Sequence, residues 1–318
     1  MKGVFFDGQL KLVDLPKPEY ASKEALIHLL KAGICNTDLE ITKGYFGFKG
    51  VLGHEFVGIV EASRNPALVG RRVVGEINAA CGRCEYCRKQ LQRHCPSRSV
   101  LGILNRDGAF REYLTLPEEN LHPVPDSISD EEAVFTEPLA AACEILDQVP
   151  VQSTDKVAVL GDGKLGLLIA MVLSRTGCHL SLIGKHPEKM KLVQAYQVEA
   201  VELGLAQSLS RGFDIVVEAT GSPAGWSQAL GLVKPRGTIV LKSTFHGQIA
   251  FNPARLVVDE ITVIGSRCGR FEVALQWLKE KKIDPTKLLH HSLALERSLE
   301  AFQLARQPGV LKVLLQPS

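Results

Sequence analysis

Residues 156–177 read KVAVLGDGKLGLLIAMVLSRTG, and this stretch decides the fold of a large part of the chain. The mainly apolar run at 156–160 predicts a buried strand, and the longer apolar run at 165–177 predicts a helix. Between them, residues 161–166 form a GxGxxG turn. A strand, a glycine-rich turn and a helix in this order favour a βα unit that binds a dinucleotide, with the pyrophosphate at the helix N-terminus.

The glycines of this turn differ in what they permit. Gly161 allows the tight turn, Gly163 lets the backbone approach a pyrophosphate, and Gly166 lets helix and strand pack closely. Lys164 and Leu165 lie between the second and third glycines. We take these five residues as candidate cofactor-binding residues.

The alternation of strand and helix continues after this unit. Near-continuous apolar strands separated by helices predict a buried parallel sheet with right-handed crossovers. The predicted strands are 179–184, 214–219, 238–243 and 261–266, and the predicted helices are 186–198 and a segment around Trp226.

The two ends of the chain have a different texture. Residues 1 to about 140 contain short β-type runs broken by Gly and Pro, which predicts an irregular, mostly antiparallel domain. The last 50 or so residues predict two helices, at 271–282 and 295–305, and a closing strand at 310–317. The predicted class is therefore α/β, with a mostly-β domain beside a doubly wound parallel sheet.

The end of the second predicted strand of the sheet indicates which dinucleotide binds. An NAD site usually has Asp or Glu there, about 20 residues after the glycines, to hold the ribose 2′-hydroxyl. Here Lys185 and His186 occupy that place, and Glu188 lies further along. A cation at the strand end favours the 2′-phosphate of NADP(H), with NAD(H) as the alternative.

Four cysteines within 15 residues form the sharpest local motif. Their spacing suits a tetrahedral zinc site that would hold a small lobe, residues 81–98, with little core of its own. An iron–sulfur cluster is the competing interpretation because a proline follows the last cysteine, but the seven-residue last gap fits it poorly. The four residues are Cys81, Cys84, Cys87 and Cys95.

A second set of candidate ligands is dispersed along the chain. Cys35, the His54–Glu55 pair and Glu137 offer one thiolate, one imidazole and two carboxylates. Such a set could form an open catalytic zinc site with a position left for water or substrate.

Composition excludes several classes of protein. The 318 residues include 37 Lys+Arg and 35 Asp+Glu, and 45% are hydrophobic, which is typical of globular proteins and not of disordered ones. The net charge of +2 gives no electrostatic case for nucleic-acid binding. No apolar run is long enough for a membrane span or a signal peptide. We expect a cytoplasmic protein with no membrane or nucleic-acid partner.

Taken together, these motifs resemble the zinc-dependent medium-chain dehydrogenases, and most closely their sorbitol, threonine and glucose dehydrogenase branches. The resemblance spans nearly the whole chain. It rests on KAGICNTD (31–38), GHEFVGIV (53–60), the four cysteines, TEPLA (136–140), GDGKLG (161–166), EATG (218–221) and VIGS (263–266).

The resemblance implies a GroES-like catalytic domain at 1–145 and 271–318, and a Rossmann domain at 146–270. It also implies two zinc ions per chain. Cys35, His54, Glu55 and Glu137 would bind or flank the catalytic ion, and the four clustered cysteines would bind a structural one. Thr37 would pass on the substrate proton, Asp38 would orient an imidazole ligand, and Thr220 would contact the cofactor.

The function implied is hydride transfer between a secondary alcohol or polyol, or the matching ketone or aldehyde, and NADP(H). An NAD-dependent polyol or amino-alcohol dehydrogenase is the alternative, and a non-catalytic family member is a third hypothesis. The family also implies a homodimer or homotetramer, for which the segment 261–269, ITVIGSRCG, could supply the edge strand.

Overall fold

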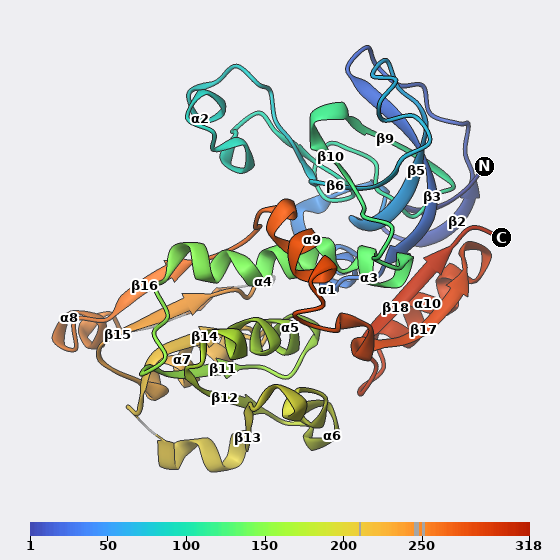
Figure 1. Cartoon of the computed structure of the whole chain (residues 1–318). Coiled ribbons are helices and arrows are strands. Elements are labelled where there is room, and N and C mark those ends of the chain that lie inside the picture. The colour runs from blue at the N-terminus through green and yellow to red at the C-terminus, as the bar shows by residue number, and fades with distance from the viewer. Residues whose placement is uncertain (210, 245–247, 250–251) are drawn as a thin grey trace. The chain divides into compact units, whose positions relative to one another are not determined.

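The computed structural model describes residues 1–209, 211–244, 248–249 and 252–318 (Figure 1). The chain divides into two compact units. The first contains residues 1–137 and 271–318, and the second contains residues 138–270. The domain boundary predicted at 145/146 falls inside helix α4 (Thr136–Gln148), which begins at the very end of the first unit and runs into the second.

A six-stranded, wholly parallel sheet forms the centre of the second unit, in the order β13-β12-β11-β14-β15-β16. The chain starts in the middle at β11, moves outward to β13, then returns to β14 and proceeds to the other edge. This order places a reversal between β11 and β14, where doubly wound sheets bind their ligands. The strands are β11 (Lys156–Leu160), β12 (His179–Gly184), β13 (Glu199–Glu202), β14 (Phe213–Glu218), β15 (Val233–Leu241) and β16 (Thr262–Gly265).

The helices of this unit include α5, which is almost wholly buried, in keeping with its apolar sequence. Trp226 on α7 packs in the same core as Leu160 and Ile239 of the sheet. The helix predicted over 186–198 is shorter: α6 covers only its first turn, and a 3₁₀ helix continues to Tyr196. The α-helices are α5 (Lys164–Leu173), α6 (Pro187–Met190), α7 (Pro223–Leu232) and α8 (Ala254–Val258).

The first unit is built around a seven-stranded sheet with the main order β10-β6-β5-β3-β18-β17, and β9 also pairs with β3. All of its pairings are antiparallel except β17 with β18. The strands are β3 (Glu24–Gly33), β5 (Glu55–Ala62), β6 (Arg72–Gly75), β9 (Tyr113–Pro117), β10 (Leu121–Pro123), β17 (Leu289–Ala294) and β18 (Lys312–Gln316).

Smaller elements complete this unit. A three-stranded sheet and a two-stranded sheet contain β2 (Leu10–Asp14), β1 (Lys2–Phe6), β4 (Gly50–Val51), β7 (Asn78–Ala79) and β8 (Ser99–Val100). The helices are α1 (Asn36–Ile41), α2 (Glu85–Arg88), α3 (Asp130–Val134), α9 (Phe271–Lys279) and α10 (Ser298–Ala305). A mostly antiparallel unit joined to a doubly wound parallel sheet confirms the predicted fold class. Among the described residues, no helix is both long and apolar enough to cross a membrane.

Candidate metal and dinucleotide sites

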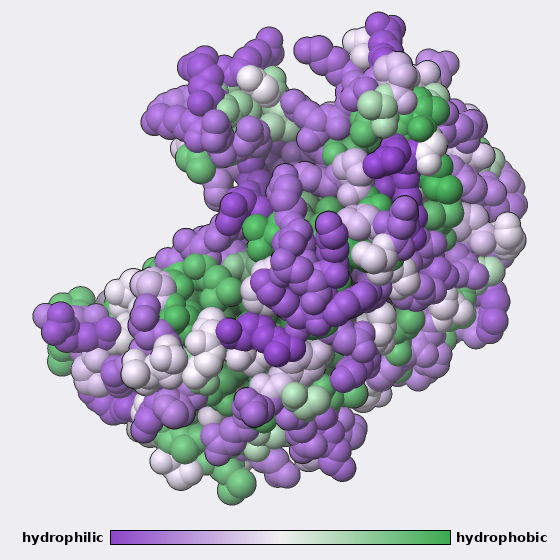
Figure 2. Space-filling model, in the orientation of Figure 1, coloured by the Kyte–Doolittle hydropathy of each residue, from purple (hydrophilic) through white to green (hydrophobic). Residues whose placement is uncertain are grey.

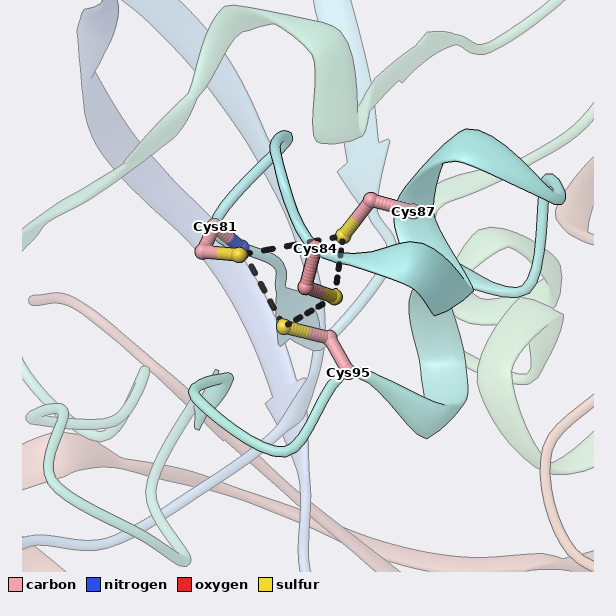
Figure 3. Close-up of side chains that lie close together, drawn as sticks. All are labelled: Cys81, Cys84, Cys87 and Cys95. Atoms are coloured by element: carbon pink, nitrogen blue, oxygen red, sulfur yellow. Dashed lines mark hydrogen bonds between the residues drawn. The ribbon is translucent and has the colours of Figure 1, made fainter.

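The four clustered cysteines point their sulfur atoms toward one another in the lobe around α2 (Figure 3). The Sγ–Sγ distances are 3.4 Å for Cys84–Cys87, 3.8 Å for Cys84–Cys95 and 4.0 Å for Cys81–Cys87. Zinc–sulfur bonds of about 2.3 Å in a tetrahedron require sulfur atoms about 3.8 Å apart. The arrangement therefore fits a four-thiolate zinc ion.

Local structure explains how these thiols converge and how they would ionise. Cys84 caps the N-terminus of α2, Cys87 lies within it, and Cys95 follows a short 3₁₀ turn. Backbone N–H groups of Arg83 and Cys84 lower the pKa of Cys81 to about 6, so this thiol is largely a thiolate near neutral pH. The lobe is mainly hydrophilic on the face seen in Figure 2, and apolar side chains such as Leu91 are exposed rather than packed inside it. A bound metal would therefore hold the lobe together.

The dispersed ligand candidates come together in the first unit through strand pairing. Gly33 at the end of β3 lies opposite Glu55 at the start of β5. The residue that starts the turn into α1, Cys35, is thereby brought beside His54. One ligand atom from each of Cys35, His54 and Glu55 lies within 4.8 Å of the others, and Thr37 Oγ1 lies 3.7 Å from Cys35 Sγ.

Asp38 fixes the geometry around this cluster. Its fully buried carboxylate accepts hydrogen bonds from the backbone N–H groups of Cys35 (2.9 Å) and Gly53 (3.1 Å). Its Oδ1 also lies 3.4 Å from Nδ1 of His54. Burial lowers the pKa of His54, but attraction to Asp38 outweighs it, so the pKa lies well above its usual value. Because Nδ1 of His54 faces Asp38, Nε2 is the ring nitrogen that remains available to bind a metal.

Glu137 lies at the start of α4. It is not one of the three residues whose ligand atoms lie within 4.8 Å of one another. Loss of solvation raises its pKa to about 7, with His54 opposing the shift and Glu55 adding to it. His54 and Glu55 are therefore among the charged groups that act on Glu137. The three mutually close candidates and Glu137 provide thiolate, imidazole and carboxylate donors, which suits zinc.

Lys312 is a residue of this site that the sequence analysis missed. Its side chain, 1% exposed, forms an ion pair with the equally buried Glu55. Burial lowers the pKa of Lys312, but the negative charges of Glu55 and Cys35 outweigh it and the pKa is raised. The only signal in the sequence is one lysine within the apolar run of a predicted strand.

Gly33 makes room for that ion pair. A Cβ atom at this position would lie 2.6 Å from Oε2 of Glu55, 2.9 Å from Val134 and 3.3 Å from the Lys312 side chain. Distances below 3.0 Å are essentially never seen around real Cβ atoms, so a side chain at this position would force Glu55 or Val134 to shift.

The glycine-rich turn of the second unit has the geometry of a phosphate cradle. Gly161 has a φ of +121°, and a Cβ there would lie 2.6 Å from the carbonyl oxygen of Ala219. A Cβ at Gly166 would lie 1.9 Å from the carbonyl oxygen of Gly161, whereas one at Gly163 would meet nothing within 4 Å. Open space at the middle glycine, at the start of α5, suits a dinucleotide pyrophosphate.

The other predicted cofactor residues lie around the carboxyl ends of the same strands. Lys164 and Leu165 are the first residues of α5, and Thr220 follows β14, where its hydroxyl donates to Glu218 over 2.6 Å. Gly184 and the exposed Lys185 line a cavity of about 810 Å³ together with Glu202, Leu203 and residues of α7. A cavity of this size can accept the adenosine part of a dinucleotide.

A carboxylate that the sequence analysis did not place there lies at the end of β12. Asp162 accepts hydrogen bonds through Oδ2 from the N–H groups of Lys185 (2.8 Å) and His186 (2.6 Å), and from the His186 ring (2.9 Å). Partial burial acts to raise the pKa of Asp162, but these donors outweigh it and the pKa is lowered.

Known proteins share both units. Residues 21–126 match the alcohol dehydrogenase GroES-like domain, and residues 165–280 match the zinc-binding dehydrogenase model. The chain belongs to the zinc-type medium-chain dehydrogenases. A sorbitol dehydrogenase of Halalkalibacterium halodurans is 29% identical over 98% of this chain and 96% of its own length.

Solved structures of this family agree with the fold over nearly the whole chain. An alcohol dehydrogenase of Escherichia coli CFT073, complexed with NADH, has a TM-score of 0.91 and 26% identity, and covers 99% of both chains. A zinc-binding dehydrogenase of Sinorhizobium meliloti, bound to NADP, has a TM-score of 0.90 and 25% identity, with the same coverage. The chain is thus an alcohol dehydrogenase-like oxidoreductase, and its relatives include proteins crystallised with either dinucleotide.

Proposed function

We propose that this medium-chain dehydrogenase transfers hydride between NADP(H) and a secondary alcohol or polyol, or the matching ketone or aldehyde, at a zinc ion. The observation that carries the proposal is the cluster of Cys35, His54 and Glu55, whose ligand atoms all lie within 4.8 Å of one another. Two zinc ions per chain are proposed, one here and one in the four-cysteine lobe.

The residues of the first unit divide the chemical work. Zinc held by Cys35, His54 and a carboxylate would lower the pKa of a substrate hydroxyl, so that it ionises near neutral pH. Thr37, whose hydroxyl lies 3.7 Å from the Cys35 sulfur, would receive the proton and pass it outward. Asp38 would keep Nε2 of His54 directed at the metal, and Glu55 or Glu137 would supply the carboxylate ligand.

Substitution of Thr37 tests this assignment. Thr37→Val removes the hydroxyl and keeps the shape, so we expect kcat to fall about 10²-fold or more, while Thr37→Ser keeps most of the activity. Metal content, measured by elemental analysis, should stay at two zinc ions per chain in both variants. Equal activity of the valine and serine variants would exclude Thr37 as the proton relay.

The preference for NADP(H) is supported by Lys185, which is exposed beside the 810 Å³ cavity and forms no ion pair in the described part of the chain. An ammonium group in that place suits a 2′-phosphate. Fluorescence titration with NADPH and NADH should show at least a tenfold preference for NADPH, about 1.4 kcal/mol, which Lys185→Asp removes. Tighter binding of NADH by the unmodified protein would favour the NAD-dependent polyol dehydrogenase instead.

A homodimer or homotetramer is also proposed, with β16 as the contact strand. This strand is an edge of the parallel sheet, and Val263 on it is 38% exposed. The adjacent helix α8 exposes Val257 and Val258 even more, at 75% and 78%. Light scattering should show a dimer or larger for the unmodified protein, and a smaller species after Val263→Lys, because charge on an edge strand opposes pairing.

The thiol-rich lobe also suits the reducing cytoplasm.

A further inference from the structure

The side chains of Asp162 and His186 are hydrogen-bonded to each other at the end of β12. Asp162 lies between the first two glycines of the turn, yet its side chain reaches across to the neighbouring strand end. A Cβ at Gly184 would lie 2.6 Å from Cβ of Asp162 and 2.7 Å from its Oδ2. The Asp162 side chain can therefore occupy this position only because residue 184 has no side chain.

The carboxylate of Asp162 is already engaged. Its Oδ2 accepts three hydrogen bonds, two from the backbone of Lys185 and His186 and one from Nδ1 of the His186 ring. An ionised carboxylate only accepts hydrogen bonds, so the ring nitrogen is the donor. The side chain of Asp162 is 12% exposed and that of His186 is 38% exposed.

A free carboxylate at this strand end would have two effects on the cofactor. It would accept a hydrogen bond from a ribose 2′-hydroxyl, and it would repel a 2′-phosphate. In this protein the acid is held inward by its donors, while the ammonium of Lys185 remains exposed. We infer that His186 determines dinucleotide choice by restraining Asp162, so that the strand end presents the Lys185 cation rather than an available carboxylate.

This inference rests on the proposed NADP(H) function and adds two specificity-determining residues to it. It differs from a simpler alternative, in which the His186 ring itself contacts the 2′-phosphate. In the alternative, loss of His186 weakens NADPH binding whatever residue stands at 162. In our inference, loss of His186 weakens NADPH binding only while Asp162 is a carboxylate.

The experiment is a set of equilibrium titrations with NADPH and NADH, followed by fluorescence, on the metal-loaded protein. The variants are His186→Ala, His186→Gln, Asp162→Asn and the double variant D162N/H186A. Glutamine keeps a donor for Asp162, and asparagine keeps an acceptor for the two backbone N–H groups. Glu199→Gln is the matched control, since Glu199 also accepts a side-chain hydrogen bond, from Ser181 over 2.8 Å, but lies at the amino end of β13 and outside the pair.

We expect His186→Ala to lower the preference for NADPH about tenfold or more, and His186→Gln to lower it less. The double variant should return to the preference of Asp162→Asn alone, whereas adding Glu199→Gln to His186→Ala should not restore it. Thermal melts before each titration identify any variant that has lost its fold. If His186→Ala is one of these, His186→Gln takes its place in the comparison with Asp162→Asn.

A failure of the proposed cofactor preference can be distinguished from a failure of the inference about the Asp162–His186 pair. If the unmodified protein binds NADH as tightly as NADPH, the proposed cofactor preference fails. If the unmodified protein prefers NADPH but His186→Ala leaves that preference unchanged, or the double variant does not recover, the inference about the Asp162–His186 pair fails alone.

Discussion

Lys312 on the last strand and Glu55 at the start of β5 form a fully buried ion pair between positions 257 residues apart in the sequence. Removing one partner of such a pair strands the other charge in a medium that solvates it poorly. Lys312 thus offsets the negative charge of Glu55, and the charges of Cys35 and Glu137 also act on it.

Lys312→Met should therefore lower the free energy of unfolding by about 3 kcal/mol, measured by urea denaturation of the zinc-loaded protein. The double variant K312M/E55Q should recover part of that loss, because it removes the stranded charge. Lys281→Met is the control: Lys281 pairs with Glu132 at 2.7 Å but is 54% exposed, and exposed pairs contribute about 0–1 kcal/mol. Equal losses in the two single variants would contradict the importance of burial.

Gly33→Ala should disturb the same pair through sterics alone. The added methyl group would overlap Oε2 of Glu55 and the Val134 side chain, so we expect a loss of about 1–3 kcal/mol in unfolding free energy. Zinc bound at the cluster should also be released more readily to a chelator. Gly204→Ala, in a 3₁₀ segment with nothing within 4 Å of the added atom, should leave both quantities nearly unchanged. A Gly33→Ala protein as stable as the control would be inconsistent with this packing.

Asp162 predicts a specific dependence of stability on pH. Its native pKa is lowered, so the stability it contributes is complete above its unfolded pKa of about 3.9 and is lost as pH falls toward the native value. The advantage of the unmodified protein over Asp162→Asn should be constant above about pH 5 and shrink below about pH 4. Urea midpoints from pH 3 to 7 measure this. An advantage that grew on acidification would have the wrong sign.

Loss of one lobe cysteine should remove one metal ion and no more. Cys84→Ser breaks the set in which Cys84 lies 3.4 Å from Cys87 and 3.8 Å from Cys95, so zinc content should fall from two ions per chain to one. Protease cleavage within residues 81–98 should then increase, since we propose that the bound metal holds this lobe together. Cys178→Ser, outside both clusters, should retain two ions and resist cleavage. Unchanged metal content in Cys84→Ser would disprove the structural site.

The sequence predicted best where burial is continuous. The strands expected at 156–160 and 179–184 have those limits in the structure, because both are buried over nearly their whole length. Strand β13, with the sequence EAVE, was missed because an exposed, charged edge strand carries no apolar signal. The ligand candidates could be named from motifs.

The partners of those candidates could not be found in the same way. The pairing of Lys312 with Glu55 depends on how β18 joins the sheet beside β3, which no local pattern encodes. The direction of the Asp162 side chain depends on the free space above Gly184. Both are tertiary relationships between segments whose own sequences give no sign of them.

Strand β18 has a consequence for biosynthesis. During translation the first 137 residues leave the ribosome with Cys35, His54 and Glu55 already present, but the strand carrying Lys312 emerges only after the whole second unit. Until then Glu55 lacks its partner Lys312, and Ala32 and Gly33 at the end of β3 lack the pairing that β18 supplies. The first unit is therefore expected to reach its native state last, although most of it is synthesised before the second unit, while the nascent second unit can fold as one continuous segment.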